Sequence, residues 1–249
     1  MTQAAVSNRS IAGGTPVGAE VGPPSLTRRG SRMMQSRAIG ALFLVGFLVY
    51  GTGSSIVTSV INRPDLLGTI APVQSLLTLG AFLILLNTAV DIAKAVLLFP
   101  IMKPHGERTA LAYLATMIVE VVFLSVGALA IVMIVPLAQH AGEPGAATLA
   151  SLLAQTNGMA YQVGQMTLGV GATALCALLF RTRLVPRWIA VSGLIGYPSL
   201  VAGTIAELFG VHIGFALTMP GFFFELALPL WLFIKGFQPE AFEGRAVRS

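Results

Sequence analysis

The chain has 249 residues, of which 55% are hydrophobic and only 10% are charged, and its formal net charge is +5. Soluble globular domains carry about 25% charged residues, so the composition excludes that class and indicates a protein of the lipid bilayer. The single cysteine, Cys176, excludes a disulfide framework and a cysteine-based metal site.

The first 37 residues are rich in Gly, Ser, Pro and Arg and contain few large apolar side chains. Such a segment cannot bury enough apolar surface to fold, which predicts a disordered tail over residues 1–37. The arginines before the next apolar run resemble the start of a signal peptide. That run, residues 38–61, is longer than the about 7–15 residues of a signal-peptide core, so we expect an uncleaved first transmembrane helix.

Six apolar segments follow the tail, and each is long enough to cross about 30 Å of hydrocarbon as a helix. They are residues 38–61, 73–99, 110–137, 159–180, 189–208 and 217–237. Within the longest connection, residues 146–155 fit a short interfacial helix. The sequence therefore predicts an all-α bundle of six transmembrane helices over residues 38–237 and a C-terminal tail over residues 238–249.

The basic residues predict the orientation of this bundle, because Lys and Arg collect on the cytoplasmic side of a membrane. Thirteen of the fifteen Lys and Arg residues lie in the N-terminal tail, in the second and fourth loops, or at the C-terminal end from Lys235 onward; the others are Arg63 and Lys94. We therefore expect a multi-pass protein of the plasma membrane with both termini in the cytoplasm. Since the basic residues lie between apolar spans, they favour lipid as the partner and argue against nucleic acid.

Three of the predicted spans carry a carboxylate near mid-depth: Asp91, Glu120 and Glu225. At 1.5 Å of rise per residue, each lies about 15–18 Å from the cytoplasmic end of its helix. Asn87, Asp91 and Lys94 are spaced i, i+4 and i+7, so they share one helix face, which we expect to turn away from lipid. Charged groups at this depth cost about 2.5–3.5 kcal/mol each on insertion scales, and they mark functional sites by default.

If all four charged side chains ionised, the set would carry two net negative charges. Desolvation and repulsion between carboxylates oppose that state, so we expect either a protonated acid or a bound cation. Three interpretations stay open: a ligand or proton site, a structural hydrogen-bonded network worth about 1 kcal/mol per contact, and unrelated positions at the lipid boundary. Lys94 has an alternative of its own, since its long stem could reach the cytoplasmic surface.

Pro229 adds a second feature to the last span, because it has no N–H with which to bond the carbonyl of Glu225. A freed carbonyl beside a carboxylate is typical of ion sites in transporters. The alternative is a proline kink without a function.

Three stretches resemble a bacterial membrane family called domain of unknown function 4386. They are Leu97-Leu98-Phe99-Pro100 with the residues before it from Leu86, Arg183-Leu184-Val185-Pro186-Arg187-Trp188-Ile189-Ala190, and Pro220-Gly221-Phe222-Phe223-Phe224-Glu225 onward to Phe237. The likeness covers about residues 38–237. It implies an architecture and a bacterial inner membrane, but no reaction, because the family has no established activity.

The chain departs from the pattern of this family at one informative place. Members often carry an arginine three residues before the glutamate that matches Glu120, where this chain has Met117. They usually lack charges at the positions of Asp91 and Lys94. The resemblance therefore implies that an intramembrane cation has moved to the second span, with Lys94 as the replacement partner of Glu120.

Signatures of enzymes and cofactors are sparse, since the chain has no nucleophile elbow, phosphate-binding loop or Cys/His cluster. We expect no catalysis and no cofactor. The sequence favours a small transporter or permease whose polar core binds a proton, a cation or a small polar ligand; this core comprises Asn87, Asp91, Lys94, Glu120 and Glu225. The alternative is a non-catalytic membrane scaffold or sensor with a structural polar network. Neither interpretation specifies a substrate or an oligomeric state.

Overall fold

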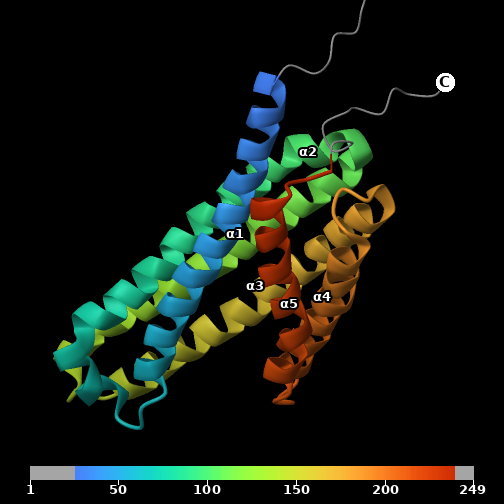
Figure 1. Ribbon diagram of the computed structural model, residues 1–249. Helices are drawn as coiled ribbons and strands as arrows, with labels where there is room; N and C mark the ends of the chain where they lie inside the picture. Colours follow the sequence, from blue (N-terminus) through green and yellow to red (C-terminus); the bar gives the residue numbers. More distant parts are fainter. Residues whose placement is uncertain (1–25, 239–249) are drawn as a thin grey trace, which may run out of the picture.

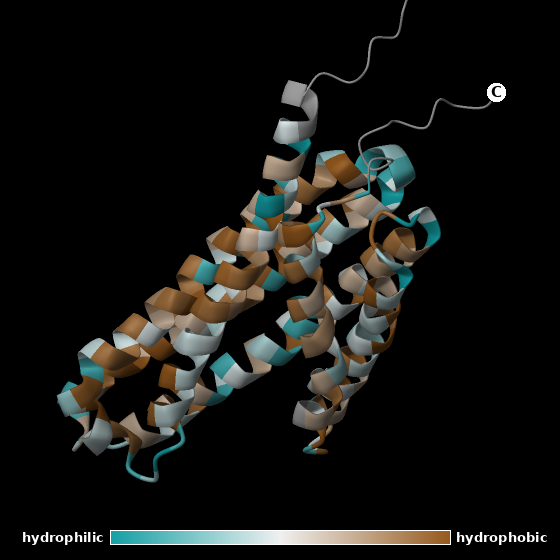
Figure 2. Cartoon of the chain, in the orientation of Figure 1, coloured by the Kyte–Doolittle hydropathy of each residue, from teal (hydrophilic) through white to brown (hydrophobic). Residues whose placement is uncertain are grey.

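The computed structural model describes residues 26–238, and this part of the chain contains helices and no strands. The elements are α1 (Leu26–Ile61), α2 (Leu66–Leu137), the short 3-10 helix η1 (Ala138–His140), α3 (Ala146–Thr182), α4 (Arg187–Leu208) and α5 (Gly214–Ile234). Five helices in this range are long and apolar enough to cross a membrane. Apolar residues predominate along their length, and hydrophilic residues lie at the ends of the bundle and at a few places midway (Figure 2). The all-α class and the multi-pass membrane character are confirmed.

The helix α2 contains two of the predicted spans, residues 73–99 and 110–137. Its 72 residues would extend about 108 Å if straight, which is far more than the hydrocarbon thickness of about 30 Å. At Gly106 the backbone leaves the helical region, with φ 177° and ψ 83°. There the chain reverses, so that a first arm (residues 66–105) and a second arm (residues 107–137) run side by side (Figure 1). The polar loop predicted between the two spans is therefore a bend at one residue.

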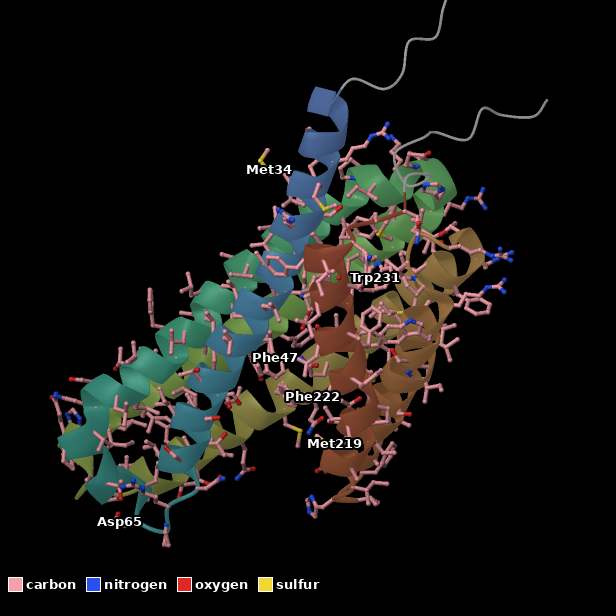
Figure 3. All side chains as sticks on the ribbon, in the orientation of Figure 1. Met34, Phe47, Asp65, Met219, Phe222 and Trp231 are labelled. Carbon is pink, nitrogen blue, oxygen red and sulfur yellow. The ribbon has the colours of Figure 1, made fainter. Side chains whose placement is uncertain are left out.

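The long helices form a closed ring of neighbours, in which α1 contacts α2 and α5, while α3 and α4 complete the circuit. Between α1 and α5, the rings of Phe47 and Phe222 meet edge to face at 5.4 Å (Figure 3). Between α4 and α5, a Cβ added to Gly196 would lie 2.5 Å from the Cα of Gly221. Only glycine allows the two backbones to come this close.

One end of the bundle gathers the start of α1, the bend of α2, the end of α3, the start of α4 and the end of α5 (upper part of Figure 1). The Phe237 N–H donates to Ser36 Oγ at 3.3 Å, and Arg37 Nε donates to the Phe233 carbonyl at 3.2 Å. These bonds connect α1 to the end of α5. Because the bend of α2 and the turn between α3 and α4 lie at this end, most of the loop cations lie there too.

The helix α1 begins at Leu26, so residues 26–37 are helical, whereas their composition predicted a disordered tail over residues 1–37. Extending a helix that already exists adds a hydrogen bond per residue without a new nucleation step, and the contacts to α5 hold the extension. Residues 1–25 of the predicted tail and residues 239–249 lie outside the described residues. The helix α3 likewise begins early, at Ala146, and absorbs the separate interfacial helix predicted at 146–155.

The apolar core has two parts with a polar layer between them. On the first arm of α2, Ile84 belongs to one apolar cluster and Ala95 to the other. On the second arm, Leu124 and Met117 divide in the same way around Glu120. Asp91 and Glu120 therefore lie where the two clusters meet, inside the bundle.

Candidate functional site

Three of the predicted site residues form a hydrogen-bonded group on the first arm of α2. Asn87 Nδ2 donates to Asp91 Oδ2 at 2.6 Å, and Lys94 Nζ donates to Asp91 Oδ1 at 2.8 Å. Asn87, Asp91 and Lys94 are 4%, 5% and 8% exposed. Their shared face points into the bundle, as the i, i+4, i+7 spacing predicts.

Lys94 does not reach the cytoplasmic surface, which was the alternative for this residue. Its Nζ lies 4.5 Å from the centroid of the Phe43 ring on α1 and pairs with Asp91. A cation over an aromatic face gains electrostatic attraction from the ring. Lys94 was also predicted as the replacement partner of Glu120. Its Nζ instead bonds the carboxylate of Asp91, which lies one turn away on the same helix.

Glu120 occupies the buried face of the second arm of α2 and is 3% exposed. Its Oε1 accepts a long hydrogen bond from Gln165 Nε2 of α3, at 3.4 Å. The charges of Asp91, Lys94 and Glu225 all act on this carboxyl group. The acids therefore belong to one electrostatic group, although they come from three segments of the chain.

Glu225 of α5 is half-buried and accepts a short hydrogen bond from the hydroxyl of Tyr197 on α4. Tyr197 also meets Phe224 edge to face at 5.4 Å. The Glu225 charge acts on Lys94 and on the buried Tyr113 of α2. Pro229 lies inside α5 and the helix continues past it to Ile234.

Two oxygen atoms of this group have no hydrogen-bond donor within residues 26–238. They are Glu120 Oε2 and Asn87 Oδ1, and both atoms are buried. The third buried side-chain polar atom without a partner is a donor, Trp231 Nε1. Since buried polar atoms in native proteins are nearly always paired, the two oxygens can accept a donor that the described protein does not supply.

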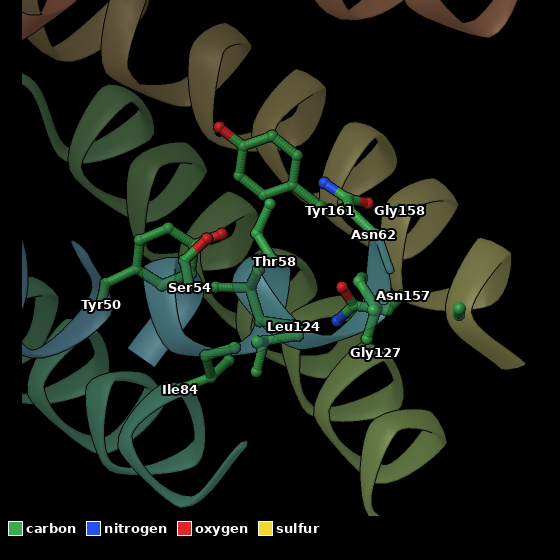
Figure 4. A pocket seen from close by; sticks show the side chains of 13 residues that line it. Tyr50, Ser54, Thr58, Asn62, Ile84, Leu124, Gly127, Asn157, Gly158 and Tyr161 are labelled. Carbon is green, nitrogen blue, oxygen red and sulfur yellow. The ribbon is translucent and has the colours of Figure 1, made fainter. Parts of the chain in front are cut away.

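A cavity of about 410 Å³ lies on the side of this group that faces away from the bend of α2. Side chains from α1, from both arms of α2 and from α3 converge on it (Figure 4). Tyr50 and Tyr161 stack with their ring centroids 6.1 Å apart. The charge of Glu120 acts on both of these tyrosines, so the cavity and the acidic group are close neighbours.

Sequence reasoning missed the tyrosines of the site. Tyr113 lies seven residues before Glu120 and so falls on the same helix face, a spacing that could have identified it. Tyr197, Tyr50 and Tyr161 approach the acids from other helices, and the spacing within one helix carries no signal for such pairs. Among the described residues, no group of three His, Cys, Asp or Glu side chains could hold a metal ion.

Comparison with known proteins gives one result. No curated protein and no solved structure matches the chain significantly. The sequence model of one family, described as a domain of unknown function (DUF4386), matches residues 38–236. That range includes the bend of α2, the acidic group and the cavity, and it covers well over half of the chain. The chain therefore belongs to the DUF4386 family.

Proposed function

We propose that this protein is a small, non-enzymatic membrane transporter or permease whose polar core binds a proton, a cation or a small polar ligand. The core comprises Asn87, Asp91, Lys94, Glu120 and Glu225. One observation carries the proposal: two buried acceptor oxygens, Glu120 Oε2 and Asn87 Oδ1, have no hydrogen-bond donor within residues 26–238. A proton on Glu120, or a bound cation or donor group, would satisfy them.

The charges of the core support the same proposal. Asp91 and Lys94 compensate each other, whereas Glu120 and Glu225 have no direct cationic partner within the described residues. An ionised carboxylate without a partner is costly inside a bundle. Proton uptake and cation binding both relieve that cost, and ionisable groups at mid-membrane are typical of proton relays and ion paths.

A scaffold or sensor with a structural core is the second candidate, and one observation favours it. Both oxygens of Asp91 are paired within its own helix, as in a network that only stabilises packing. The unpaired oxygen of Glu120 counts against this alternative, because a purely structural network would leave no buried acceptor unsatisfied.

The proposal includes an arrangement in the membrane. With the two arms of α2 counted as separate spans, the chain crosses six times, and both termini lie on the cytoplasmic side of the bacterial plasma membrane. The end of the bundle that gathers the bend of α2 and the α3–α4 turn carries Lys103, Arg108, Arg181, Arg183 and Arg187. The opposite loops carry Arg63, and this asymmetry supports the orientation.

The test is proton flux into liposomes that contain the purified chain and an internal pH dye, driven by an imposed pH gradient. We expect flux above that of empty liposomes, and at least about tenfold slower flux for Glu120→Gln, since an amide does not gain or lose a proton near neutral pH. The matched control is Glu143→Gln, the same change at an exposed residue outside the core. If Glu120→Gln and Glu225→Gln only lower the melting temperature and leave flux unchanged, the scaffold interpretation replaces this one.

A further inference from the structure

The cavity beside the acidic group has the size of a ligand site. Its volume of about 410 Å³ lies within the range of about 300–1,000 Å³ that small-molecule pockets occupy. It lies between α1, the two arms of α2 and α3 (Figure 4). A bare inorganic ion would fill only a small part of it.

The lining of the cavity mixes polar and apolar residues and is uncharged, since no Asp, Glu, Lys or Arg is among its described lining residues. Several of its polar side chains make no hydrogen bond to any other described residue: Thr58, Asn62, Asn157 and Tyr161. Two of them are amides, which present a carbonyl oxygen. The lining therefore offers acceptor oxygens and two tyrosine rings to whatever enters.

On both arms of α2 and on α3, the inner wall of the cavity is one helical turn from a core residue or from Gln165, which bonds Glu120. Leu124 lies four residues after Glu120, Ile84 lies three before Asn87, and Tyr161 lies four before Gln165. One turn is about 5.4 Å. Ile84, Leu124 and Tyr161 therefore line the end of the cavity that lies nearest to the unpaired acceptors Glu120 Oε2 and Asn87 Oδ1.

The charges around the cavity select one class of ligand. No Lys or Arg side chain is among its described lining residues, so an anion would find no cationic partner there. The loop that follows the cavity-lining end of α1 adds no net charge, because Arg63, which donates to the Ser59 carbonyl, is balanced by Asp65 two residues later. Tyrosine faces and amide oxygens favour a cation that is large and weakly hydrated.

We propose that this cavity is the binding site of a small organic ammonium ion, which rests between Thr58, Asn157 and the Tyr50–Tyr161 pair before it meets the acidic core. Movement of the ammonium ion from the cavity into the acidic core rests on the proposed function, and the cavity specifies which class of solute would move. Binding in the cavity itself needs no transport. It can therefore be measured separately.

The experiment titrates choline into the full-length purified chain in maltoside micelles by calorimetry. The comparison probe is 3,3-dimethylbutan-1-ol, which has the shape of choline but carries a carbon in place of the charged nitrogen. We expect choline to bind at least about tenfold more tightly than this neutral isostere, a difference of about 1.4 kcal/mol. Equal affinity of the two probes, or no binding of choline, would overturn the proposal.

Two variants locate the site. Thr58→Val and Asn157→Leu remove a hydroxyl and an amide from the lining, and each should weaken choline binding by about tenfold. The matched control is Thr156→Val, the same chemical change at the exposed neighbour of Asn157, whose hydroxyl bonds the Leu152 carbonyl outside the cavity. Wild-type affinity in both lining variants would overturn the assignment. Thr58 is exposed near the end of α1, so Thr58→Val keeps the test decisive even if Asn157→Leu does not fold.

Two further measurements distinguish a free solute from a lipid headgroup, and the cavity assignment from the proposed function. Equal choline affinity in phosphatidylethanolamine and phosphatidylglycerol nanodiscs supports a free solute, whereas weaker binding in phosphatidylethanolamine overturns that part in favour of a lipid headgroup. Choline binding with no proton flux in liposomes would refute proton transport through the core and leave the cavity assignment standing. Proton flux with no choline binding would refute the cavity assignment alone.

Discussion

Asp91 and Lys94 form an ion pair at 2.8 Å between side chains that are only 7% and 10% exposed. A second Lys–carboxylate pair on the same helix, Lys103 with Glu107 at 3.2 Å, has side chains that are 52% and 65% exposed. Burial decides what each pair is worth, because a charge that loses its partner can be hydrated at the surface but not inside the bundle.

This contrast gives the first residue-scale prediction. Lys94→Met should lower the free energy of unfolding by about 3–5 kcal/mol, since it leaves Asp91 as an uncompensated buried charge. Lys103→Met should cost less than about 1 kcal/mol. Unfolding in mixed micelles, followed by circular dichroism, measures both. Adding Asp91→Asn to Lys94→Met should restore part of the loss, and a double variant less stable than the single one would contradict the pairing.

At the scale of helices, the interior stripe of α2 is the part of the site that could be predicted from sequence. Asn87, Asp91 and Lys94 lie on one helix, and the 3.6-residue period alone fixes their common face. The hydrogen bond between Tyr197 and Glu225 could not be predicted, because it depends on how α4 and α5 rotate against each other. That rotation follows from the close contact of Gly196 with Gly221, which the spacing within one helix does not reveal.

The contact between α4 and α5 gives an element-scale prediction. Gly196→Ala should destabilise the protein by about 1–3 kcal/mol, because the new Cβ would lie 2.5 Å from the backbone of Gly221 and force the helices apart. Gly51→Ala is the matched control, since a Cβ there meets nothing within 4 Å and alanine is the better helix former. Thermal unfolding of the two variants checks the order. A Gly196→Ala protein as stable as Gly51→Ala would show that α4 and α5 do not need this contact.

For the whole molecule, the number of spans and their orientation depend on α2. Hydropathy locates its two apolar stretches, and that much of the fold was accessible to sequence reasoning. The early start of α1 and the continuity of α3 from Ala146 were not, because helices extend beyond their apolar part when neighbouring segments hold them. The polar loop predicted between the second and third spans is instead a bend at Gly106. Both arms stay helical up to this residue, because its non-helical backbone alone reverses the chain.

The bend makes the topology testable with three acidic positions that are all exposed: Asp65 before α2, Glu107 at the bend and Glu143 after η1. If both arms of α2 cross the membrane, Asp65 and Glu143 lie on the same outer side and Glu107 lies in the cytoplasm. In a Cys176→Ala background, Asp65→Cys and Glu143→Cys should react with a membrane-impermeant maleimide in intact bacterial cells, and Glu107→Cys should react only after permeabilisation. A chain that crosses once through α2 would put Asp65 and Glu143 on opposite sides, so only one of them would be labelled. That pattern would leave an odd number of spans and place the termini on different faces, and the charge asymmetry of the loops would then need another cause.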